Sequence, residues 1–193
     1  MVRKPIISEL CRIALVLTAA FALRAQGPPN QPVNRGALLS QDFQQRVTDY
    51  LKMRKTVEAG MPKLKPTGSP AEIAEHEREL ARRIREARPR ARQGDIFTPE
   101  ISAEFRHIIE ITMRGGHAAR IKQSLKSAEP VQLRLGVNDT YPASVPLQST
   151  PPALLLNLPK LPAQVEYRVV GHNLLLRDVG ANLIVDWLPA AIP

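Results

Sequence analysis

Glutamates and histidines at helical spacing are the residues of this sequence whose chemistry is easiest to define. Glu104 and His107 lie three positions apart, which places them on one face of a helix and matches half of the pattern used by di-iron bundles. No second Glu-x-x-His pair is present, but Glu72, His76 and Glu79 could form another face that holds a metal ion weakly. The alternative is a charged helix surface with ordinary salt pairs. The predicted metal ligands are Glu72, His76, Glu104 and His107.

Positive charge is the second chemical feature. The chain has 27 Lys and Arg against 18 Asp and Glu, a formal net charge of +9. Much of the excess lies in one run, whose members are Arg82, Arg83, Arg85, Arg88, Arg90 and Arg92. Such a run can contact phosphate, anionic lipid or acidic polysaccharide through charge, but it is also typical of a solvated helix end. Nucleic acid is not the expected partner, because the run holds no aromatic side chains on which bases could stack.

Aromatic residues beside an arginine form a third candidate, near the C-terminus. Protein interfaces are enriched in Tyr, Trp and Arg, and the interface residues predicted here are Tyr167, Arg168 and Trp187. The alternative is that they belong to the core and rim of the domain.

The sequence lacks the motifs of nucleophilic and cofactor-dependent enzymes. No serine has the glycine-flanked setting of a nucleophile turn, and Gly115-Gly116 is too short to cradle a phosphate. The only cysteine, Cys11, lies near the N-terminus, which excludes disulfides and thiolate sites from the rest of the chain. We therefore expect no catalytic residue and no cofactor, with an enzyme whose site is assembled from distant residues as the alternative.

The N-terminus has the pattern of a secretory signal. Arg3, Lys4 and Arg12 precede an apolar run over residues 13–23, which is roughly half the length of a membrane-spanning helix. Small residues at Ala20 and Ala22 favour cleavage near residue 22, or near residue 25 as a second choice. The prediction is a signal peptide over residues 1–25, no membrane anchor after cleavage, a periplasmic or secreted mature protein, and a flexible segment over residues 26–38.

The elements that must position these groups divide into two regions, of which the first, residues 39–128, is helical. Its helices are expected to begin at Ser40, at the Ser69-Pro70-Ala71-Glu72 capping box and at Thr98-Pro99, with a short fourth helix over residues 117–126. Apolar residues three and four apart mark their buried faces. In chain order these residues are Phe43, Val47, Tyr50, Leu51, Val57, Ile73, Leu80, Ile84, Ile101, Phe105, Ile108 and Met113. The prediction is a bundle of three to four helices.

The second region contains a proline-rich connector and strands. Prolines forbid a long helix over residues 129–164, although one short strand at Val131, Leu133 and Leu135 and one helical turn after Thr150 are expected. Three apolar runs over residues 165–188, separated by Gly and Asn, predict an antiparallel β-meander that packs back on the helices. The predicted fold class is α+β.

The C-terminal quarter also carries a family resemblance. The segments Leu158-Pro159-Lys160-Leu161-Pro162, Glu166-Tyr167-Arg168-Val169-Val170-Gly171, Leu174 to Asp178, and Ala181-Asn182-Leu183-Ile184-Val185-Asp186 resemble the C-terminal end of a family of small exported bacterial proteins. More distantly they are similar to the terminal hairpin of periplasmic stress and metal-homeostasis proteins. The resemblance implies an exported auxiliary protein and assigns no catalytic residue.

Taken together, these patterns predict an exported, non-enzymatic auxiliary protein of the cell envelope or secreted space. It would act by contact with an envelope protein or an anionic polymer. A periplasmic metal-binding or stress-response protein and an enzyme of unrecognised type are the alternatives, and the oligomeric state stays open.

Overall fold

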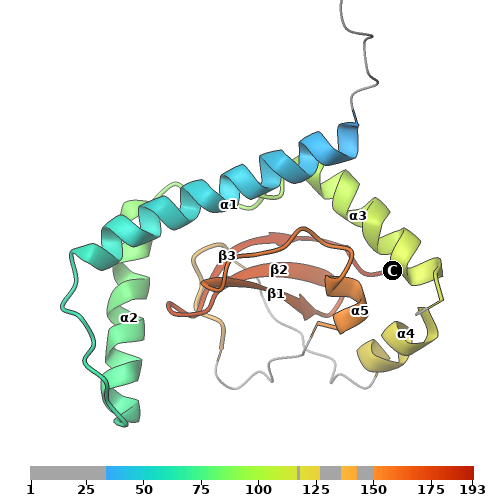
Figure 1. The fold of residues 1–193 in the computed structure, drawn as a ribbon. Helices are drawn as coiled ribbons and strands as arrows, with labels where there is room; N and C mark the ends of the chain where they lie inside the picture. The colour runs from blue at the N-terminus through green and yellow to red at the C-terminus, as the bar shows by residue number, and fades with distance from the viewer. Residues whose placement is uncertain (1–33, 117, 127–135, 143–149) are drawn as a thin grey trace, which may run out of the picture. The chain divides into compact units, whose positions relative to one another are not determined.

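The computed structural model describes residues 34–116, 118–126, 136–142 and 150–193 (Figure 1). Among these residues, helices come first and a three-stranded sheet follows, so the predicted α+β class is confirmed. The helices are α1 (Arg35–Ala59), α2 (Pro70–Ala87), α3 (Pro99–Arg114), α4 (Ala118–Lys126) and α5 (Pro152–Leu155), and the strands are β1 (Val165–Val170), β2 (Asn173–Asp178) and β3 (Leu183–Leu188). The predicted signal peptide and the short strand at Val131, Leu133 and Leu135 lie outside the described residues.

Helix α1 begins earlier than the sequence suggested. The predicted start was Ser40, but the side chain of Asn34 accepts a hydrogen bond from the N–H of Ala37 at 3.2 Å, and the helix runs from Arg35. Asn and Ser cap helices about equally well. The polar, Pro- and Gly-rich composition up to Gly36 favoured a flexible segment over residues 26–38, but residues 35–38 belong to α1.

The caps of α2 and α3 are as predicted, but the predicted burial of Ile73 is not. Ser69 Oγ accepts from the N–H of Glu72, and Thr98 Oγ1 accepts from the N–H of Ile101, each at 3.4 Å. The assignment of Ile73 to the buried face is wrong, because 47% of it is exposed. Ile73 lies in the first turn of α2, whereas the buried residues of this helix begin at Leu80. The first turns of α2 therefore extend past the core.

The sheet is antiparallel, with strand order β1-β2-β3. β1 and β2 pair in continuous register, whereas the pairing of β2 with β3 shifts between Leu176 and Arg177. Leu176 lies opposite Asp186 and Arg177 opposite Ile184, so Val185 has no opposite residue. This is a β-bulge. It lets the consecutive residues Val185 and Asp186 both be fully buried.

One face of the sheet and the helices share a single apolar core. Four aromatic rings lie at its centre. Phe43 of α1 lies 4.8 Å from Phe105 of α3, 5.5 Å from Phe97 and 6.3 Å from Tyr167 of β1, measured between ring centroids. Such ring pairs add to the free energy of burial by about 0.5–1.5 kcal/mol each. The core therefore joins elements from both regions of the chain.

A buried carboxylate attaches α1 to the sheet. Asp178, at the end of β2, is fully buried and accepts hydrogen bonds from Arg54 Nε at 2.7 Å, from the hydroxyl of Tyr50 at 2.8 Å and from the N–H of Ala181 at 2.8 Å. Arg54 also pairs with Glu58 at 2.6 Å. Burial, together with the charge of Asp178, raises the pKa of Tyr50, so its hydroxyl remains a donor.

A second buried carboxylate holds the loop between α2 and α3 against β3. Asp186 accepts from the backbone N–H groups of Ile96, Phe97 and Trp187 at 2.8 Å and of Gly94 at 3.0 Å. Burial raises the pKa of Asp186, while these N–H groups oppose that shift. Gly94 has φ +93°, a left-handed conformation that favours glycine. The loop depends on both residues.

Replacing Asp178 with Asn should lower the free energy of unfolding by about 3 kcal/mol, because one partner of a buried ion pair is removed and the Arg54 charge remains. Urea denaturation followed by far-ultraviolet circular dichroism measures this change. The control is Asp49→Asn, which removes an exposed ion pair with Lys52 and should change stability by less than about 0.5 kcal/mol. Equal effects of the two substitutions would contradict the anchoring role of Asp178.

Candidate functional site

The predicted metal ligands lie in two separate places. Glu72 and His76 of α2 line a cavity of about 450 Å³ with the loop that follows α1. Glu104 of α3 lies instead beside Gly36, in the first turn of α1. The two ends of this 25-residue helix are about 37 Å apart. Within the described ranges, no three His, Cys, Asp or Glu residues gather where they could hold a metal ion, so Glu72, His76, Glu104 and His107 do not form one site.

Most arginines of the run pair or hydrogen-bond with other groups of the protein. Arg82 pairs with Glu79 at 2.7 Å and with Glu86 at 2.5 Å, and Arg83 pairs with Glu79 at 2.6 Å and donates to the carbonyl of Gly60 at 2.8 Å. Hydrogen bonds from Arg82 and Arg83 lower the pKa of Glu79 to about 2. These are the ordinary salt pairs that the sequence offered as an alternative to a metal site on this helix.

The next two arginines attach α2 to the C-terminal region. Arg85 donates to the carbonyl of Asn138 at 2.9 Å and to Thr140 Oγ1 at 2.6 Å. Arg88 donates to the carbonyl of Val185 at 3.1 Å, and its guanidinium carbon lies 5.3 Å from the centroid of the Tyr50 ring. Arg90 and Arg92 are exposed, and Arg92 lies 3.7 Å from Asp95. The prediction of a polyanion site therefore rests mainly on Arg90 and Arg92.

The three predicted interface residues do not share one surface. Tyr167 is a core residue, only 7% exposed, and its hydroxyl donates to the carbonyl of Pro159 at 3.0 Å. Arg168 and Trp187 lie on the other face of the sheet, because successive strand residues point to opposite faces. There the half-buried Trp187 packs against a small cluster that includes Tyr141 and Ile184. Tyr167 therefore shares no face of the sheet with Arg168 and Trp187, and its assignment to an interface stays a prediction.

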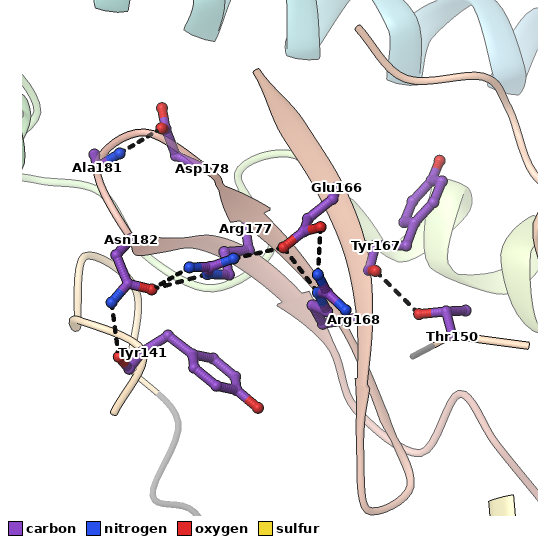
Figure 2. Close-up of polar contacts among 9 residues, drawn as sticks. All are labelled: Tyr141, Thr150, Glu166, Tyr167, Arg168, Arg177, Asp178, Ala181 and Asn182. Atoms are coloured by element: carbon purple, nitrogen blue, oxygen red, sulfur yellow. Dashed lines mark hydrogen bonds and ion pairs between the residues drawn. The ribbon is translucent and has the colours of Figure 1, made fainter. Parts of the chain in front are cut away.

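The outer face of the sheet carries a charged cluster that the sequence analysis missed (Figure 2). Glu166 accepts from Arg168 Nη2 and from Arg177 Nη1, each at 2.6 Å. Arg177 also donates from Nε to Asn182 Oδ1 at 2.9 Å, and its guanidinium carbon lies 5.6 Å from the Tyr141 ring centroid. The register places Glu166 opposite Arg177. Pairing the predicted strands residue by residue would have found this contact.

Partial burial alone would raise the pKa of Glu166, but hydrogen bonds from Arg168 and Arg177 hold it below its ordinary value of 4.5. The two guanidiniums and one carboxylate leave this cluster with a net positive charge.

A pocket of about 510 Å³ lies along β1, which is an edge strand with its partner β2 on one side. Thr150 Oγ1 donates to the carbonyl of Tyr167 at 3.0 Å, which shows that this carbonyl points to the outer edge. The walls are mainly apolar, and the rim carries charge. The lining residues are Thr150, Leu155, Pro159, Lys160, Leu161, Val165, Glu166, Tyr167 and Arg168. We take this pocket as the candidate binding site.

The low pKa of Glu166 makes a signed prediction about acid stability. A carboxylate whose pKa is lowered on folding stabilises the protein above its unfolded pKa, and this contribution is lost as the pH falls through the folded pKa. Glu166→Gln should therefore be less stable than the parent at neutral pH, and the difference should shrink below about pH 4.5. Urea midpoints measured across this range, with Glu110→Gln as an exposed-pair control, test it. A difference that is constant with pH would contradict the assignment.

Comparison with known proteins does not assign this chain to a family. No family model, no curated protein and no solved structure matches the chain. The resemblance of the C-terminal segment to small exported proteins thus remains a prediction, and the case for a function rests on the described residues.

Proposed function

We propose that this chain is an exported, non-enzymatic auxiliary protein of the cell envelope or secreted space. It acts by contacting another protein through the pocket beside β1. The observation that carries the proposal is the combination, in one place, of apolar walls, a charged rim and neighbouring exposed leucines.

The leucines of α5 support a contact surface. Leu155 is 41% exposed and Leu156, which follows it, is 83% exposed. Single exposed leucines are common on protein surfaces, but apolar side chains gathered beside a pocket and rimmed by charge are typical of interaction sites. Arg168 adds a residue type that interfaces favour. Burial of these leucines against a partner would remove them from water, which stabilises the complex.

Protein contact is favoured over polyanion contact by the arginine run. Five of its six members hydrogen-bond or pair with groups of the protein itself: Arg82, Arg83, Arg85, Arg88 and Arg92. A polyanion would have to compete with these contacts to engage the run. The pocket beside β1 requires no such rearrangement.

The buried carboxylates favour a binding protein over an enzyme, because their hydrogen bonds hold elements of the fold together. Asp178 and Asp186 bond to Arg54, to Tyr50 and to backbone N–H groups. Each of these contacts joins two elements of the fold. A catalytic acid or base must instead reach a substrate in a pocket.

Export is supported by the charged and apolar pattern over residues 1–25. N-terminal sequencing of material recovered from outside the cytoplasm should return a chain that begins at Leu23 or Gln26, because Ala20, Ala22 and Ala25 provide the small residues that signal peptidase requires. Intact Met1 or Val2 on that material would contradict the proposal of a cleaved signal.

Photo-crosslinking tests the contact surface. With p-benzoylphenylalanine at Leu156, exported chain in living cells should form one discrete crosslinked species, because this exposed residue follows Leu155, which lines the pocket. The matched control is the same residue at Leu38, which is 52% exposed on α1 and should give none. The substitution Lys160→Glu, on the pocket rim, should reduce the crosslink. No species at Leu156, or equal species at both positions, would contradict the proposed surface.

A further inference from the structure

We infer that the segment of the partner that enters the pocket beside β1 is an acidic peptide, with an apolar side chain next to a carboxylate. This inference rests on the proposed function and names the chemistry of its partner. Two features of the pocket carry it: the charge of its rim and its apolar walls.

The charge of the rim selects a negative group. Lys160 is exposed and lines the pocket. Arg168 also lines the pocket, and both Arg168 and Arg177 pair with Glu166. The pocket lining thus carries two cations, Lys160 and Arg168, and one carboxylate, Glu166, which is already shared between two guanidiniums. A partner carboxylate at this rim meets an excess of positive charge, whereas a partner cation is repelled.

The walls select an apolar group. Leu155, Leu161 and Val165 line the pocket, and its volume of about 510 Å³ falls within the range of sites that enclose a side chain or small ligand. A polyanion without apolar groups would leave these walls in contact with water. The pocket therefore fits a peptide better than a phosphate or sulfate polymer.

Two backbone groups of β1 at the pocket are bonded within the chain. Thr150 Oγ1 donates to the carbonyl of Tyr167 at 3.0 Å, and the N–H of Val165 donates to the carbonyl of Pro162 at 3.1 Å. The pocket follows β1 from Val165 to Arg168, so a partner segment contacts its walls and its rim through side chains.

Fluorescence anisotropy with two labelled hexapeptides tests the inference on the exported chain. One peptide alternates leucine with aspartate, and the other alternates leucine with asparagine. The aspartate peptide should bind, and the asparagine peptide should bind about fivefold or more weakly, because it lacks the charge that the rim attracts. Binding of the aspartate peptide should also weaken as salt is raised.

Charge variants locate the site. Lys160→Glu should weaken binding of the aspartate peptide about three- to tenfold, since attraction is replaced by repulsion. Lys160→Arg should retain binding. Lys63→Glu changes the net charge equally but lines a different cavity, so it should leave the affinity unchanged. Lys160→Gln repeats the test without charge reversal if Lys160→Glu lowers the melting temperature.

The outcomes separate this inference from the proposed function. Equal binding of the two peptides, or equal effects of the Lys160 and Lys63 variants, would overturn the acidic partner. If neither peptide binds but the crosslink at Leu156 persists, the inference fails and the contact surface stands. Loss of both results overturns both. A concentration-dependent dimer in sedimentation that Lys160→Glu disrupts would assign the pocket to a second copy of the chain and overturn the inference.

Discussion

The buried carboxylate of Asp178 accepts hydrogen bonds from Arg54 and Tyr50 of α1, and the placement of the helices on the sheet depends on this contact. Removing these charges from water is costly unless every hydrogen-bonding group has a partner. The contact is satisfied only when α1 lies against the turn after β2 in one register. Apolar packing alone is tolerant of small shifts, so the carboxylate adds the specificity that the aromatic core lacks.

The second buried carboxylate extends the same arrangement to the other helices. The β-bulge in β3 lets Asp186 be buried beside Val185, and Asp186 then holds the loop that leads into α3. Arg85, in the last turn of α2, donates to the carbonyl of Asn138, and Arg88, which follows α2, donates to the carbonyl of Val185. These two side chains attach the C-terminal end of α2 to the region that contains the strands. Hydrogen bonds and ion pairs with defined partners therefore surround the apolar core.

Among the described residues, the outer side of β1 is one place where apolar and charged side chains are open to a partner. The core-facing residues of the sheet are covered by helices, and most of the arginine run is bonded within the molecule. The pocket beside β1 keeps apolar walls with Lys160 on its rim. Glu166 is held ionised between two guanidiniums, so the net charge of this cluster stays constant above the lowered pKa of Glu166.

The sequence by itself determined the α+β class, the caps at Ser69 and Thr98 and the three strands, because these depend on residues within a few positions of each other. It could not show that Tyr167 belongs to the core or that Arg88 reaches Val185. Those outcomes depend on strand register, on the bulge and on which helix lies over which face. They are decided only when distant parts of the chain pack together, since a guanidinium that is free in one arrangement is bonded in another.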